Sequence, residues 1–360
     1  MKNKILTISF VLFLFLFLIM NFTTKDIEIS KNERRNLTQL PKISIKNILD
    51  KSYMDKFEKY TLDQFPLRND FRHLKSFINY NVFNKLDNNK IYIKNNYIFK
   101  SDYPLNNESI KNFTNKIDMI NKKYLTKKNK VYLSIIPDKN YYFKDKNTLN
   151  INYEELISNV TTKLDYIKYI DLTKSLDLDS YYQTDTHWKQ EKLENVITKL
   201  SNEMNFNKYN GNYIKNEYNK FYGVYYGQAA IKRKPEKITY LTNENIKGAK
   251  VSHYESKKSN KVYNESKLEG IDSYDVFLDG ASSLIEIEND NIKNNKELII
   301  FRDSFGSSIT PLLIDSYKKI TLIDLRYISS DNLKDLVSFK EQDILFLYSA
   351  LVINNSFTLK

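Results

Sequence analysis

The sequence predicts an α/β fold in which a mostly parallel sheet carries helices on both faces, preceded by an N-terminal transmembrane helix. Two stretches, 108–204 and 298–348, alternate short apolar segments with amphipathic ones. This alternation is typical of parallel strands that are joined by crossover helices and covered on both sides. The transmembrane helix is indicated by residues 5–22, ILTISFVLFLFLFLIMNF, which contain no charged side chain.

The apolar N-terminal segment follows Lys2 and Lys4. Eighteen helical residues at about 1.5 Å each span roughly 27 Å, close to the thickness of the hydrocarbon core. Positive charge before the segment favours an N-terminus inside the cell and a remainder outside it. Because no small-residue cleavage motif follows, we expect an uncleaved signal anchor in the cell membrane. The alternative is a cleaved signal peptide and a secreted protein.

Three parts follow from this organisation. Residues 1–24 form the anchor, 25–90 a membrane-proximal helical segment, and 91–360 the α/β domain, with a Tyr-rich insertion at about 205–295. Apolar residues at helical spacing predict helices over 46–85, interrupted at Pro66. The stretch 91–100 predicts two short strands joined by a turn at Asn95-Asn96.

The α/β domain is predicted from short apolar runs and from helical stripes between them. The predicted strands are 131–136, 166–172, 298–301, 320–325 and 344–348. The predicted helices are 108–126, 153–164, a run from Trp188 to about 204, 304–317 and 332–339.

Composition excludes several kinds of chemistry. The chain has no cysteine, which rules out disulfides, thiolate zinc sites and cysteine nucleophiles. With only three histidines we expect no metal site and no cofactor. The net charge of +12 is scattered among acidic residues, so we expect no nucleic-acid partner. The abundance of Lys, Asn, Ile and Tyr is typical of an AT-rich bacterial genome and accounts for part of that charge.

A first polar motif, YYQTDTHWKQ at 181–190, places Asp185 two residues before His187. In an extended segment, side chains two residues apart point to the same side. The carboxylate can therefore bind the imidazole, fix its tautomer and stabilise its protonated form. The alternative is that Asp185 caps the next helix and that His187 is only a surface neighbour.

A second motif, LIIFRDSFGSS at 298–308, places Ser304 where an apolar strand ends and a helix begins. Open α/β sheets place active sites at the carboxyl ends of their strands. Amides at a helix N-terminus also stabilise an oxyanion. The alternative is that Ser304 or Asp303 serves only as the N-cap of the helix.

Together the two motifs supply a nucleophile, a base and an orienting acid, the minimum set for acyl transfer. With them, the chain resembles the DHHW family, relatives of the alginate O-acetyltransferase group, over most of residues 30–350. Further motifs that carry the resemblance are DQFPLR at 63–68, IPDK at 136–139, FYG at 221–223, YDVFLDG at 274–280 and IDLRY at 323–327. The resemblance implies a circularly permuted SGNH-hydrolase-like fold.

The resemblance also implies that Ser304 is the nucleophile, His187 the base and Asp185 its partner. The chain departs from the family pattern at three positions. It has Thr186, Arg302 and Ala281 where the family has His, Gly and Asn. The last departure removes an oxyanion donor of the family.

Five further residues are substrate-binding or oxyanion candidates: Arg326, Arg302, Lys139, Trp188 and Gly280. Arg326 and Lys139 follow strand ends, where they would bind an acidic or hydroxylated substrate or form a structural ion pair. Trp188 would stack on a sugar or pack in the core.

The function implied is that of an extracytoplasmic O-acetyltransferase acting on a cell-envelope or secreted polysaccharide. The resemblance implies a membrane-bound O-acyltransferase as the partner that supplies acetyl groups across the membrane. Two alternatives remain open at this stage. One is a carbohydrate esterase, in which water replaces the sugar acceptor. The other is a non-catalytic glycan-binding or scaffold protein of the envelope.

Overall fold

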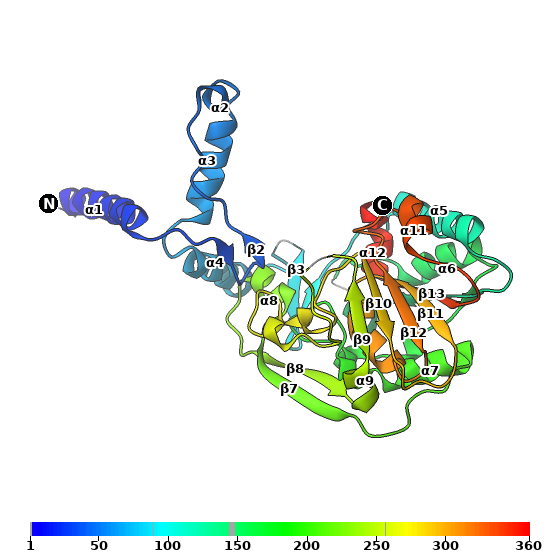
Figure 1. Cartoon of the computed structure of the whole chain (residues 1–360). Coiled ribbons are helices and arrows are strands. Elements are labelled where there is room, and N and C mark those ends of the chain that lie inside the picture. The colour runs from blue at the N-terminus through cyan, green and yellow to red at the C-terminus, as the bar shows by residue number, and fades with distance from the viewer. Residues whose placement is uncertain (1, 89, 144–147, 256) are drawn as a thin grey trace. The chain divides into compact units, whose positions relative to one another are not determined.

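The computed structural model describes residues 2–88, 90–143, 148–255 and 257–360. Figure 1 shows the chain, which divides into two compact units. Unit 1 consists of Met1–Asn88 with Tyr226–Arg233, and unit 2 of Asn89–Tyr225 with Lys234–Lys360. The division into an anchor (1–24), a membrane-proximal segment (25–90) and an α/β domain (91–360) stays a prediction.

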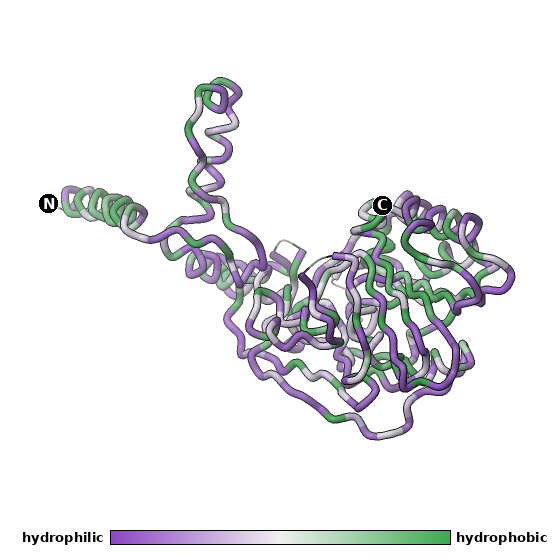
Figure 2. The backbone as a smooth tube through the Cα atoms, viewed as in Figure 1, coloured by the Kyte–Doolittle hydropathy of each residue, from purple (hydrophilic) through white to green (hydrophobic). Residues whose placement is uncertain are grey.

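Unit 1 begins with α1, Lys2–Thr23, which is long and apolar enough to cross a membrane. None of its described residues is buried, and Figure 2 shows it green along most of its length. The other elements of this unit are mostly short. They are β1 (Ile29–Ser30), β2 (Arg35–Asn36), α2 (Ile45–Leu49), α3 (Ser52–Asp63), α4 (Arg68–Phe77) and a π-helical turn, Ile78–Val82.

An ion-pair network fixes the turn between α3 and α4, where the sequence predicts an interruption at Pro66. Arg35 binds Asp63 through two guanidinium nitrogens at 2.9 and 2.5 Å, and Arg68 binds Glu33 at 2.5 Å. The hydrogen bonds from Arg35 hold the pKa of Asp63 well below its usual range. The charged side chains therefore tie the segment around Glu33 and Arg35 to the turn between α3 and α4.

Unit 2 is built on a seven-stranded sheet in the order β6-β5-β13-β11-β12-β10-β9. The five strands from β6 to β12 run parallel, whereas β10 pairs antiparallel with both β12 and β9. The strands are β5 (Lys130–Ile136), β6 (Lys168–Tyr169), β9 (Lys250–His253), β10 (Leu284–Glu288), β11 (Glu297–Arg302), β12 (Lys319–Ile323) and β13 (Asp343–Ser349).

Alternate residues of the central strands point into two separate cores. In β11, Leu298 and Ile300 join one hydrophobic cluster, while Ile299 and Phe301 join the other. This division requires cover on both faces of the sheet, as the continuous apolar runs predict. The predicted α/β class with a mostly parallel sheet is therefore confirmed.

The predicted helices of unit 2 are found at their predicted positions, but four predicted elements are shorter than expected. The helices are α5 (Asn107–Tyr124), α6 (Tyr153–Lys163), α7 (Glu194–Met204), α9 (Glu244–Gly248), α10 (Phe305–Ile309), α11 (Leu333–Leu336) and α12 (Ala350–Asn354), while most residues of α8 (Val224–Ala229) belong to unit 1. α7 starts after Trp188 because a 3₁₀ turn, Gln190–Lys192, comes first. α10 gives way to a 3₁₀ turn around Pro311, α11 covers four residues of the predicted 332–339, and β6 has only two residues.

Two hairpins accompany the main sheet. β3 (Ile91–Lys94) pairs with β4 (Tyr97–Lys100), and the turn residues Asn95 and Asn96 have positive φ values of 45° and 67°, as a type I′ turn requires. The predicted hairpin is confirmed. Within 205–295, β7 (Ile214–Phe221) pairs with β8 (Glu236–Thr242), whereas β9 and β10 extend the main sheet.

Candidate active site

Ser304 lies directly beyond the carboxyl end of β11, before α10 begins at Phe305. Asp303 shapes this turn. One of its carboxylate oxygens accepts from the Phe305 amide at 3.0 Å, and the other accepts from the Ser349 amide at 2.8 Å. The Ser304 side chain makes no capping hydrogen bond to α10. Capping therefore falls to Asp303, and the Ser304 hydroxyl is left for another partner.

That partner is His187, which joins Ser304 to Asp185 in one hydrogen-bonded chain. The Ser304 hydroxyl lies 2.7 Å from His187 Nε2, and His187 Nδ1 lies 2.6 Å from Asp185 Oδ1. Asp185 is fully buried, His187 is 7% exposed and Ser304 is partly exposed. Because a carboxylate only accepts hydrogen bonds, Nδ1 carries the proton and Nε2 presents its lone pair to the hydroxyl. The structure thus brings together the three residues that the sequence predicts.

The carboxylate of Asp185 is held by backbone as well as by imidazole. Its Oδ1 also accepts from the His187 amide at 3.0 Å, and Oδ2 accepts from the Val224 amide at 2.7 Å. Gly223 allows this approach. A Cβ placed there would lie 2.2 Å from the carbonyl carbon and oxygen of Thr184. The FYG motif therefore supports Asp185, because the position of Gly223 requires a residue without a side chain.

Two charged side chains, the buried Lys139 and the partly buried Glu236, hold the loop that carries Asp185. The Lys139 ammonium donates to the carbonyls of Tyr182, Gln183 and Asp185 at 3.0, 3.1 and 2.8 Å. Glu236 accepts from the Gln183 and Thr184 amides at 2.6 and 2.7 Å. Burial lowers the pKa of Lys139 to about 7.

This arrangement corrects the substrate-binding expectation for Lys139. An ammonium group has three donors, and Lys139 uses all three on backbone carbonyls. The side chain is 2% exposed and has no donor left for a ligand.

Aromatic side chains pack around His187. The rings of Tyr274 and His187 stack with centroids 3.8 Å apart and planes 10° apart. The Tyr274 hydroxyl and the Trp188 indole nitrogen both donate to the Ser308 hydroxyl, at 2.7 and 2.8 Å. Trp188 is fully buried, so it cannot stack on a sugar and that expectation is wrong. The structure shows the alternative, in which Trp188 packs in the core.

The other candidates lie elsewhere. Arg326 binds both oxygens of Asp324, at 2.9 and 2.6 Å, so its alternative as a structural ion pair is the one observed. Gly280 has a φ of 76°, and its amide donates to the Phe277 carbonyl at 3.3 Å. No described hydrogen bond brings either residue to Ser304 or His187.

Arg302 is buried directly behind the site. Its guanidinium is 1% exposed and lies 3.7 Å from Asp324, and within the described chain its Nε and Nη2 have no hydrogen-bond partner. A Cβ on Gly306 would lie 2.7 Å from the Arg302 Cβ. Arg302 therefore fills the space beneath α10.

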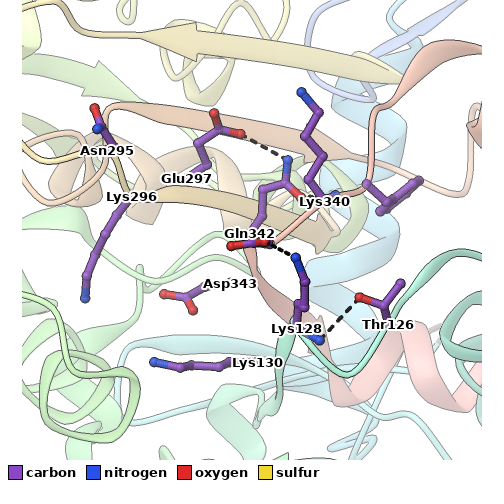
Figure 3. A pocket seen from close by; sticks show the side chains of 11 residues that line it. Thr126, Lys128, Lys130, Asn295, Lys296, Glu297, Lys340, Gln342 and Asp343 are labelled. Carbon is purple, nitrogen blue, oxygen red and sulfur yellow. Dashed lines mark hydrogen bonds and ion pairs between the residues drawn. The ribbon is translucent and has the colours of Figure 1, made fainter.

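The cavity drawn in Figure 3 lies away from these residues. Within the four described ranges, no cluster of three or more His, Asp or Glu side chains could hold a metal ion. The cavity in Figure 3, about 820 Å³, is lined by Lys130, Glu297 and Asp343, which begin β5, β11 and β13. It lies at the amino ends of the strands, opposite the end where Ser304 follows β11.

Comparisons with known proteins place the fold. No family model and no curated protein matches this sequence. Among solved structures, a DHHW family protein from Eubacterium siraeum is 20% identical, with a TM-score of 0.63 over 76% of this chain and 94% of that one. The chain has the fold of a DHHW family protein. The DHHW resemblance carried by the motifs is thereby confirmed.

Bacillus cereus PatB1 shares this DHHW-like fold. It is 19% identical, with a TM-score of 0.59 over 74% of this chain and 97% of its own. A second structure of PatB1 carries a sulfonyl adduct and aligns with a TM-score of 0.57 at 19% identity, over 73% of this chain and 97% of its own.

Sequence reasoning missed the groups that hold Asp185 and its loop in place. Val224 contributes only its backbone amide, and Gly223 contributes only by lacking a side chain. Neither valine nor glycine is a residue type that indicates a catalytic site in a sequence. Glu236 lies 52 residues after Thr184, to whose amide it binds. The one available signal was FYG at 221–223, a motif of the family resemblance to which no function was assigned.

Proposed function

We propose that this protein is an extracytoplasmic O-acyltransferase, specifically an O-acetyltransferase that modifies a cell-envelope or secreted polysaccharide. Ser304 is the nucleophile, His187 the general base and Asp185 the residue that orients the base. The observation that carries the proposal is the continuous hydrogen-bonded chain from Ser304 Oγ through both imidazole nitrogens to a buried carboxylate.

The chemistry proceeds in two steps. His187 Nε2 takes the Ser304 proton as the hydroxyl oxygen attacks the acyl carbonyl carbon. The leaving group departs with that proton, and an acyl ester remains on Ser304. A sugar hydroxyl then gives its proton to His187 and attacks the ester, which transfers the acyl group and returns the proton to Ser304. Asp185 stabilises the imidazolium in both steps and keeps its own charge.

Two further observations support this proposal. The Ser304 side chain is partly exposed while its base and acid are buried, so a reagent can reach only the nucleophile end of the chain. In addition, PatB1, whose fold is similar, forms a sulfonyl adduct. Sulfonyl reagents react with activated nucleophiles, which is the role proposed here for Ser304.

The proposed location is outside the cytoplasm, with α1 as a single-pass anchor. Lys2 and Lys4 precede the apolar segment and orient it with the N-terminus inside. A membrane-bound O-acyltransferase is the proposed supplier of acetyl groups, and secretion after cleavage of α1 is the alternative. Protease added to intact protoplasts should digest the chain beyond residue 30, and protection until lysis would contradict this placement.

The test separates transfer from hydrolysis and from binding. Purified full-length protein in detergent is given an activated acetyl ester, with and without envelope polysaccharide. We expect an acetyl-enzyme by intact mass, acetylated glycan when the acceptor is present, and neither with Ser304→Ala. Acetate as the sole product at every acceptor concentration would favour an esterase. If wild type and Ser304→Ala give the same products and both still bind glycan, the protein is a glycan-binding scaffold and not an enzyme.

A further inference from the structure

The face of α4 opposite its polar contacts forms an exposed apolar stripe. Leu67, Phe71 and Leu74 recur at helical spacing and are 53%, 41% and 51% exposed. Phe65 and Phe77 extend the stripe and are 39% and 58% exposed. A row of five large apolar side chains at this exposure is unusual on a soluble surface and marks a contact with something apolar.

The other face of α4 is fixed by hydrogen bonds inside unit 1. Arg72 donates to the Gly227 carbonyl at 2.7 Å, His73 Nδ1 lies 2.6 Å from the Ala230 carbonyl, and Ser76 donates to the Ala229 carbonyl at 2.7 Å. These contacts set which side of the helix is free. The stripe therefore points outward as a consequence of how α4 is held.

The depth of the stripe follows from its contacts with α1. The Phe17 ring stacks on the Phe65 ring, with centroids 5.5 Å apart, and its centroid is 5.8 Å from that of Phe71. Phe17 lies six residues before Thr23, where α1 ends, so it is about 9 Å along the helix axis from that end. Half of a hydrocarbon core is about 15 Å thick. If α1 crosses the membrane, Phe65 and Phe71 lie within the apolar layer.

Charged groups adjoin the stripe at its N-terminal end. Arg68 donates through Nε to the Leu62 carbonyl at 3.1 Å and through Nη1 to Glu33 at 2.5 Å. Leu67 itself has a φ of 59°, a conformation that a branched residue adopts only when its surroundings hold it. An apolar face bordered by charged side chains is the pattern of helices that lie in the membrane interface.

We propose that Phe65 and the α4 stripe lie in the outer leaflet of the membrane that α1 crosses, where lipid acyl chains cover them. Lipid is the occupant favoured because the stripe is continuous with Phe17, a residue of the membrane helix itself. The inference concerns how the protein sits at the membrane, and it is independent of acyl transfer.

The test uses the absence of cysteine in the chain. Full-length Leu67→Cys and Leu74→Cys variants, each labelled with an environment-sensitive fluorophore, are reconstituted as the sole protein in phosphatidylglycerol and phosphatidylethanolamine vesicles. Lys122→Cys is the control, because its side chain is 74% exposed on α5 in unit 2. Quenchers attached to lipid acyl chains and aqueous iodide are added separately.

Labels at both stripe positions should show blue-shifted emission, loss of fluorescence with the acyl-chain quencher and protection from iodide. The label at position 122 should show the reverse. Iodide quenching at positions 67 and 74, without quenching from the acyl chains, would overturn the proposal. That result would indicate a protein partner as the cover of the stripe.

Discussion

Replacing Gly223 by alanine tests whether the backbone support of Asp185 matters for catalysis. The added Cβ would lie 2.2 Å from the carbonyl carbon of Thr184, whereas ordinary contacts begin at 3.4 Å. The neighbour is backbone and cannot rotate away, so the Thr184–Asp185 peptide must retreat by roughly 1 Å. A displacement of about 1 Å at a catalytic group costs about 100-fold in rate. Overpacking of this kind costs about 1–3 kcal/mol of stability.

The assay compares Gly223→Ala with Gly248→Ala, in which the new Cβ meets nothing closer than 3.4 Å. Both proteins are assayed with an activated acetyl ester, and thermal unfolding establishes that each is folded. We expect kcat to fall about 100-fold for Gly223→Ala and to stay unchanged for Gly248→Ala. A folded Gly223→Ala protein with wild-type kcat would refute the reasoning that the Val224 amide must hold Asp185.

Three further predictions concern the charged and aromatic neighbours. Burial lowers the pKa of Lys139 in the folded chain, so the unfolded chain keeps this proton to higher pH. The free energy of unfolding of the wild type should therefore rise relative to that of Lys139→Met as the pH rises from about 7 towards 10, by at most about 1.4 kcal/mol per pH unit, measured by denaturant titration. Trp188→Phe removes the hydrogen bond to Ser308, so the free energy of unfolding should fall by roughly 1–3 kcal/mol. The KM for glycan should stay unchanged. Arg326→Ala should lower the free energy of unfolding by up to about 3 kcal/mol, because buried Asp324 would keep only Arg302, 3.7 Å away, as an ion partner. A raised KM without destabilisation would instead show substrate binding.

The strands and the three residues of the proposed site were predictable because their signals are local. Apolar runs such as 131–136 identify buried strands, and an Asp two residues from a His can meet it in any extended segment. A serine directly after an apolar strand lies at the functional end of a parallel sheet. These features require no knowledge of which segments meet in space.

The supports of the site could not be predicted, because they depend on contacts between distant segments. Lys139 looked like a ligand-binding residue at a strand end, yet it meets three carbonyls more than 40 residues along the chain. The sequence around Trp188 does not indicate whether the indole faces solvent or binds Ser308. Helix lengths near 3₁₀ turns were also misjudged, because a single turn has the same apolar spacing as the start of an α-helix.

Covalent labelling of Ser304 tests the central claim most directly. Full-length protein is treated with a sulfonyl fluoride and examined by intact mass and peptide mapping. The account predicts one adduct on Ser304, none in Ser304→Ala, little in His187→Ala, and wild-type labelling in Ser307→Ala, the matched control on α10. An adduct that persists in Ser304→Ala, or that maps to another residue, would contradict the assignment of Ser304 as the nucleophile.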